Sequence, residues 1–106
     1  MLTQVRYQDS LRENPAMAVY ADVAKKLDTH IREMANVDAN SPDLNDDTHI
    51  FDYGFVDSFG AVALVEFVER TFSIKVTDKD LVTRPLNTIR EIATLVLERQ
   101  AESKPS

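Results

Sequence analysis

The residues best suited to chemistry are Asp57 and Ser58, which stand where a long polar loop meets an apolar helix. A serine at a helix N-terminus lies beside free backbone amides and the positive end of the helix dipole, and both favour a phosphate group. The hydroxyl of Ser58 is therefore a candidate for a phosphodiester linkage. Because Ser and Asp are also preferred helix caps, the dipeptide taken alone favours a structural role.

Other kinds of reactive site have little support in the sequence. The chain has no cysteine, so any thiol would have to be supplied by a cofactor. His30 and His49 stand apart from any set of sequence-adjacent ligands, which argues against a metal site or a catalytic base. Residues 43–54 open like a calcium-binding loop, but Thr48 occupies the sixth position and Gly54 the twelfth. We therefore predict no bound metal and, lacking an acid, base and nucleophile set, no enzymatic activity.

The element before the candidate site is predicted to be an amphipathic helix over residues 15–36. Asn14 and Pro15 are suited to its start. Its apolar residues recur every three or four positions: Val19, Val23, Leu27, Ile31 and Met34. Residues 37–57 are rich in Asp, Asn and Ser and have no helical periodicity, so we expect a long loop that Ile50 and Phe51 anchor to the core.

A second helix is predicted from Ser58 to Thr71, and it has two different faces. The core face carries Ala61, Leu64, Val65, Val68 and Phe72. The opposite face carries Phe59, Val62, Ala63, Glu66, Glu69 and Arg70. Because apolar residues rimmed by charge on an outer face mark interaction sites, this face is a candidate docking surface.

Two further helices complete the predicted fold. Thr77 to Asp80 can cap a short third helix that Arg84-Pro85 ends, and Asn87 is expected to cap a last helix. The result is an all-α bundle of three long helices and one short helix. We assign an N-terminal extension to residues 1–14, one domain to residues 15–100, and a flexible tail to residues 101–106.

The composition excludes some classes of partner. With 18 acidic and 12 basic side chains, the net charge of -6 disfavours nucleic acid and is compatible with basic protein surfaces. We find no signal peptide and no apolar run near the ~20 residues that span a bilayer. We expect a cytoplasmic monomer.

Over residues 50–76 the chain resembles the acyl carrier protein family. The resemblance rests on Asp52-Tyr53-Gly54, on Val56-Asp57-Ser58-Phe59 and on the apolar helix that follows. It continues in Phe72-Ser73-Ile74-Lys75-Val76 and at Asn87-Thr88-Ile89, and extends from about Ala16 to Gln100. The resemblance implies an acyl-carrier-type four-helix bundle with its long loop between the first two helices.

The resemblance also implies a function. In this family a phosphopantetheinyl transferase attaches 4'-phosphopantetheine to the serine of the Asp-Ser pair, a position that Ser58 occupies beside Asp57. The arm would carry an acyl or aminoacyl group from a loading ligase or acyltransferase to a downstream synthase or transferase. Phe59, Val62, Ala63, Glu66 and Glu69 would then meet these partners.

Two positions depart from the pattern of the carriers of fatty acid synthesis. Those carriers usually have acidic residues two and five positions after the serine, where this chain has Gly60 and Ala63. The chain is more similar to discrete carriers such as D-alanyl carrier proteins and the carriers of polyketide or nonribosomal peptide pathways. The cargo and pathway remain open, and the alternative is an unmodified acidic helical module that binds a basic protein.

Overall fold

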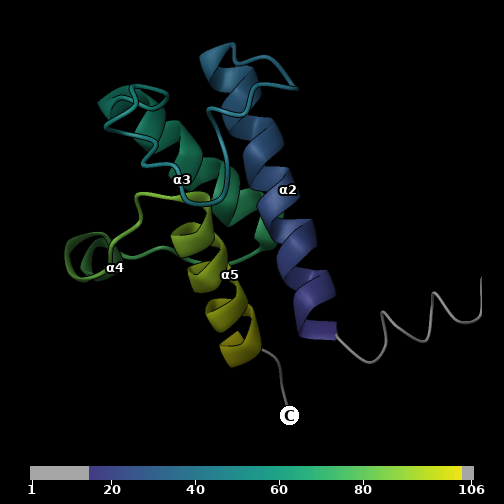
Figure 1. Ribbon diagram of the computed structural model, residues 1–106. Helices are drawn as coiled ribbons and strands as arrows, with labels where there is room; N and C mark the ends of the chain where they lie inside the picture. Colours follow the sequence, from purple (N-terminus) through teal and green to yellow (C-terminus); the bar gives the residue numbers. More distant parts are fainter. Residues whose placement is uncertain (1–14, 104–106) are drawn as a thin grey trace, which may run out of the picture.

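The structure, a computed structural model, describes residues 15–103. The predicted extension, residues 1–14, lies outside the described residues, as do residues 104–106. The described range contains helices and loops but no strand, and its helices are α2 (Pro15–Ala35), α3 (Ser58–Phe72), α4 (Asp78–Thr83) and α5 (Ile89–Ser103) (Figure 1). The prediction of an all-α bundle with three long helices and one short helix is confirmed. None of the described helices is long and apolar enough to cross a membrane.

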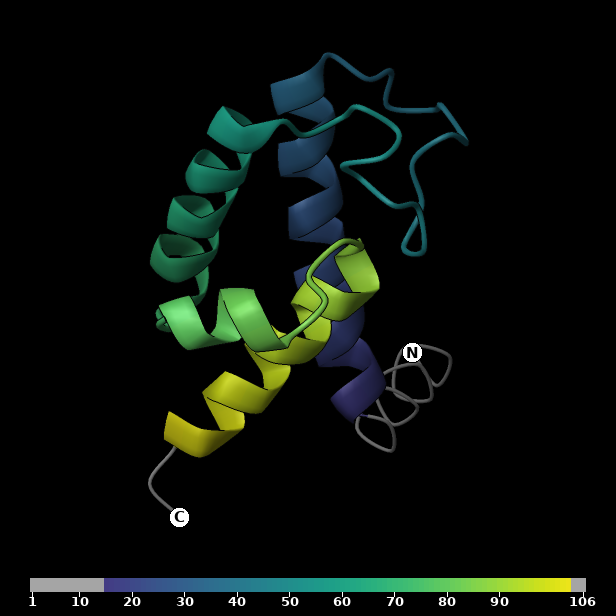
Figure 2. The same cartoon turned by 90° about the vertical axis from the view of Figure 1, so that its left-hand side faces the viewer.

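The core lies among the three long helices, and its most extensive pairing joins α2 to α5 (Figures 1 and 2). Buried apolar side chains from these helices are Val23, Ala24, Leu27, Ile31, Leu64, Val68, Phe72, Ile89, Ile92, Ala93, Leu95 and Val96. The prediction of a buried stripe on α2 is wrong for one residue, because Val19 is 44% exposed. Periodicity identifies the apolar face of a helix, but it does not show how far neighbouring elements cover that face.

The loop between α2 and α3 is held by buried side chains and by hydrogen bonds. The predicted anchors are confirmed: Ile50 is fully buried, and Phe51 packs against the core. Leu44 and Val56 are also buried, although the sequence analysis did not assign them to the core. The backbone amide of Ile50 donates to the carbonyl of Asn87 at 2.9 Å, which ties the loop to the start of α5.

Arg32, near the end of α2, binds the first half of this loop. Its guanidinium donates to the backbone carbonyls of Asp38, Ser41 and Leu44 and pairs with the Asp28 carboxylate at 2.6 Å. The acceptors are backbone carbonyls, which every residue has, so the sequence could not predict that Arg32 binds this loop. The loop is ordered because one planar five-donor group satisfies several of its backbone acceptors.

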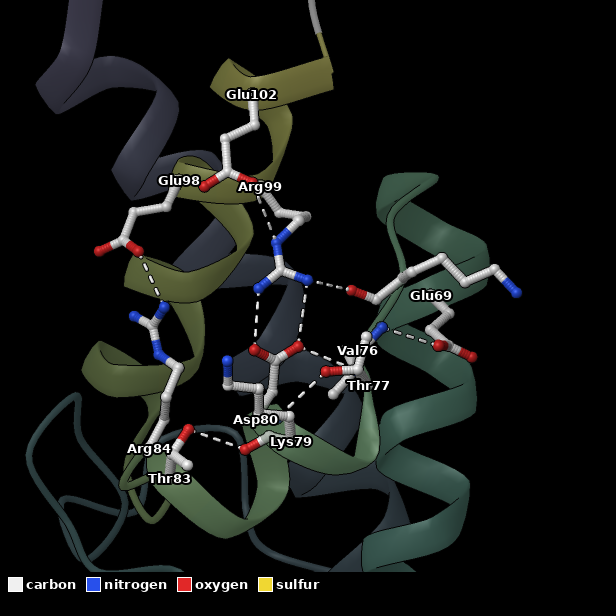
Figure 3. A network of polar contacts seen from close by, with 11 residues as sticks. Glu69, Val76, Thr77, Lys79, Asp80, Thr83, Arg84, Glu98, Arg99 and Glu102 are labelled. Atoms are coloured by element: carbon white, nitrogen blue, oxygen red, sulfur yellow. Dashed lines mark hydrogen bonds and ion pairs between the residues drawn. The ribbon is translucent and has the colours of Figure 1, made fainter.

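Helix α4 begins with the predicted cap. The Thr77 hydroxyl accepts from the Asp80 amide at 3.1 Å, and the Asp80 carboxylate accepts from the Thr77 amide at 2.9 Å. Asp80 is only 8% exposed, and the Arg99 guanidinium donates to both of its carboxylate oxygens at 2.9 and 3.0 Å (Figure 3). This pairing lowers the pKa of Asp80 well below its ordinary value and links α4 to α5.

The two ends of α5 differ from the sequence prediction. Asn87 was the predicted cap, but this is wrong, because the helix begins at Ile89 and the Thr88 hydroxyl accepts from the Glu91 amide at 3.1 Å. Both residues can cap, and the one directly before the first helical residue does so. The helix also continues to Ser103, past the predicted domain end at residue 100. An ion pair between Arg99 and Glu102 lies in this last turn.

His30 packs between α2 and α3 rather than on the open helix surface. Its ring stacks on Phe67 with centroids 3.9 Å apart, and its buried Nε2 atom has no hydrogen-bond partner among the described residues. Burial, reinforced by nearby Arg70 and opposed by Glu33, lowers the pKa of His30 from its ordinary value. The unfolded chain therefore binds a proton at this site more readily than the folded chain.

From this difference we expect the fold to lose stability in mild acid. The contribution of neutral His30 is complete above its unfolded pKa of about 6.5 and is lost as the pH falls through the lower folded pKa. Urea unfolding at about pH 7.5 and about pH 5.5 measures the change, above the range where exposed carboxylates titrate. His30→Phe keeps a stacking ring without the titration and should flatten the pH dependence of the unfolding free energy. If the unfolding free energy of His30→Phe changes with pH as much as that of the wild type, a group other than His30 is responsible.

Candidate functional site

The loop reaches α3 through a tightly held segment. Val56 is 3% exposed, and its amide donates to the carbonyl of Ile50 at 3.1 Å. Gly54 adopts a φ of 84°, a left-handed conformation that side chains disfavour, and its amide donates to the Phe51 carbonyl at 3.0 Å. The chain therefore enters α3 at a position fixed by the core, with Asp57 and Ser58 directly after the last buried loop residue.

Asp57 is the residue that caps α3. Its backbone is extended, and its carboxylate accepts a hydrogen bond from the Gly60 amide at 2.7 Å. A Cβ atom at position 60 would lie 3.3 Å from Asp57 Oδ1 and 3.3 Å from Val56 Cγ1, closer than side-chain carbons usually approach. The glycine found where fatty acid carriers have an acidic residue thus leaves room for the Asp57 cap.

Ser58 is the first residue of α3 and is exposed. The amides of Ser58 and Phe59 belong to the first turn, where a helix provides no intrahelical acceptor. A phosphate ester on this serine would meet free amides and the positive helix end, while the rest of an attached group would extend into solvent. The residues present therefore fit a phosphate-linked prosthetic group.

The residues predicted to dock partners divide into two kinds. Phe59 is 86% exposed and Val62 is 61% exposed, and Ala63 and Glu66 are exposed on the same helix. Glu69 differs, because it is half-buried and its Oε2 atom accepts a hydrogen bond from the Val76 amide at 2.8 Å. Its carboxylate is already engaged within the fold, whereas Glu66 presents its charge to solvent.

Tyr53 was not among the predicted docking residues, although it stood in the motif that carries the resemblance. It is 61% exposed and stacks on Phe55 with ring centroids 5.4 Å apart. Stacking leaves one ring face open to solvent, in the loop that leads into Ser58. The signal in the sequence was an aromatic residue beside Gly54 and close to Ser58.

The inner face of α3 borders an apolar cavity of about 70 Å³. Ala61, Leu64, Val65 and Val68 line it from α3. The remaining walls come from Phe51, Val76, Leu81, Leu86, Ile92 and Leu95. Ser58 and this cavity therefore share one helix, with the serine at its exposed start and the cavity along its inner face.

Comparison with known proteins agrees with this geometry. Residues 25–96, more than half of the chain, match the family described as the phosphopantetheine attachment site. A search of curated proteins and of solved structures gave no significant match. Proteins of the matched family bear 4'-phosphopantetheine as a covalent cofactor. The chain belongs to this phosphopantetheine-bearing family and is an acyl carrier protein family member.

Proposed function

We propose that this protein is a carrier that bears its 4'-phosphopantetheine on Ser58 and delivers a thioester-bound acyl or aminoacyl group to partner enzymes. The observation that carries the proposal is the position of Ser58: an exposed serine on the first residue of α3, inside the matched range. The buried Val56 and the Asp57 cap directly precede Ser58 and hold the start of α3, where the arm would begin.

In this proposal the chain positions the arm, and partner enzymes catalyse the reactions of the cargo. The arm, when bound, supplies the terminal thiol that the cysteine-free chain lacks and holds the cargo as a thioester. The first-turn amides and the helix dipole stabilise the phosphodiester charge. Tethering raises the effective concentration of the cargo at each partner without tight binding. The protein needs no acid or base of its own.

The proposed partners are a phosphopantetheinyl transferase, a loading ligase or acyltransferase, and a downstream synthase or transferase. Phe59 and Val62 would provide apolar contacts around the arm, together with Ala63. Glu66 would pair with a cationic group of the partner and speed the encounter at low salt. Glu69 would contribute less charge than Glu66, because its carboxylate already accepts the Val76 amide.

The pathway proposal remains broad. Gly60 and Ala63 remove charge from α3, which supports a discrete carrier of polyketide, nonribosomal peptide or cell-envelope synthesis over a fatty acid carrier. We further propose that the protein works in the cytoplasm as a monomer. Identifying the enzyme that loads the arm, for example among the neighbouring genes, would identify the cargo, since specificity lies largely in that partner.

Incubation with coenzyme A and a promiscuous phosphopantetheinyl transferase tests the proposal. Intact mass spectrometry should show the gain of one arm per chain, and fragmentation should place it on the peptide containing Ser58. Omission of coenzyme A is the matched control. If a known carrier gains mass under the same conditions and this protein does not, the proposal fails. The exposed Phe59 and Val62 would then favour an unmodified helical module that binds a basic protein.

A further inference from the structure

The cavity behind α3 is bordered on one side by a short covering segment, residues 74–86. Val76 lies in the connection before α4, Leu81 lies on α4, and Leu86 lies in the connection after it. The volume of about 70 Å³ is roughly half that of an engineered protein cavity of ~150 Å³ that binds benzene. A group as large as benzene would therefore need the walls of the cavity to move apart.

This covering segment contacts the core through buried Ile74 and through Val76 and Leu86, and polar contacts also hold it to the rest of the fold. Helix α4 has six residues, and two of its apolar side chains face solvent, with Leu81 50% exposed and Val82 83% exposed. Arg99 pairs with Asp80 and also donates to the Lys75 carbonyl at 2.9 Å, and Arg84 pairs with Glu98 at 2.9 Å (Figure 3). These contacts all join the covering segment to α5.

Glu69 provides a polar contact between the covering segment and α3. Its carboxylate accepts from the Val76 amide (Figure 3). The Val76 side chain forms part of the cavity wall. Thr77, the next residue, begins the capping box of α4. Releasing the Val76 amide would thus loosen both a wall of the cavity and the start of the helix that covers it.

We propose that residues 74–86 form a lid over the apolar cavity and that the Glu69 carboxylate holds this lid against α3. Hydrogen bonds to charged groups are stronger than those between neutral groups, so a single carboxylate can hold so short a segment. Opening of the lid would expose the inner face of α3, the helix that begins at Ser58. Glu69 thereby has a positioning role that the exposed Glu66 does not share.

Amide hydrogen exchange on the unmodified protein tests this role. Glu69→Ala should raise the exchange rates of the Val76 amide and of the α4 amides about ten- to a hundredfold, the range expected for losing a hydrogen bond to a charged group. Glu69→Gln keeps a side-chain oxygen as a neutral acceptor and should restore part of the protection. Glu66→Ala removes an exposed glutamate one turn earlier and should leave these rates unchanged.

A dye that fluoresces on apolar surface gives a second readout. Fluorescence of anilinonaphthalene sulfonate should rise in Glu69→Ala, but not in Glu66→Ala, as the lid exposes the cavity. Amides of α2 and α5, such as those of Leu27 and Val96, should keep their protection, because the opening is local. Unchanged exchange at Val76 in Glu69→Ala, or loss of protection throughout the chain, would overturn the proposal. Neither measurement depends on arm attachment at Ser58.

Discussion

Replacing Ser58 by alanine is expected to abolish attachment of the arm completely while leaving the helical bundle intact. The substitution removes the hydroxyl that would form the phosphodiester, and no cysteine or neighbouring serine on α3 can take its place. The side chain is exposed, so no core contact is lost. Intact mass after incubation with coenzyme A and transferase should show no gain.

The structure also revises the stability expected of this variant. From the dipeptide alone, Ser58→Ala would lose about 1 kcal/mol of capping. The capping carboxylate belongs to Asp57, however, and Ser58 already lies inside the helix, where alanine is favoured. We therefore expect urea unfolding of Ser58→Ala to be nearly unchanged, whereas Asp57→Ala should lose about 0.5–2 kcal/mol of unfolding free energy.

Ser73 offers a matched serine for this experiment. It is exposed at the other end of α3, with a φ of 56° in the left-handed region. Ser73→Gly suits that conformation, so this variant should stay folded and gain the arm like the wild type. An arm still present on Ser58→Ala would place the attachment elsewhere. Unfolding of Ser58→Ala at mild temperature would instead mean that the serine is mainly structural.

Truncating Leu27 to alanine is expected to have the opposite effect, with a large loss of stability and no loss of the attachment chemistry. Leu27 is fully buried on α2, at the centre of the apolar stripe that faces the core. Removing its buried methyl groups should lower the free energy of unfolding by roughly 2 to 5 kcal/mol, because both transfer energy and packing are lost. A domain of this size has only about 5–15 kcal/mol in total.

Val19 provides the control for this variant. It lies two helical turns before Leu27 on the same predicted stripe but is 44% exposed, so Val19→Ala should change the unfolding free energy by less than about 0.5–1 kcal/mol. Chemical unfolding of both variants gives the comparison. At temperatures where Leu27→Ala is folded, it should still gain the arm. Equal losses in the two variants would show that the stripe is buried evenly, contrary to the structure.

The sequence by itself determined the four helices, the loop anchors Ile50 and Phe51, and the resemblance that points to Ser58. These features are local: helical periodicity, a cap before a helix and a short motif are all written within a few neighbouring residues. The identity of the apolar face of α3 and the exposure of Phe59 and Val62 follow from the same periodicity. The family match over residues 25–96 includes the Asp57-Ser58 motif on which the resemblance rests.

Only the tertiary structure decided how these elements are joined. Val19 is exposed although α2 packs against α5, and the choice of Thr88 over Asn87 as cap depended on where α5 begins. The contact of Glu69 with Val76 and that of Asp80 with Arg99 link residues 7 and 19 positions apart. Hydrogen-bond partners brought together by folding leave no periodic signal in a single chain. The sequence could therefore place Glu69 on α3 as a predicted docking residue, but only the folded chain revealed that its carboxylate accepts the Val76 amide, in the segment leading into α4.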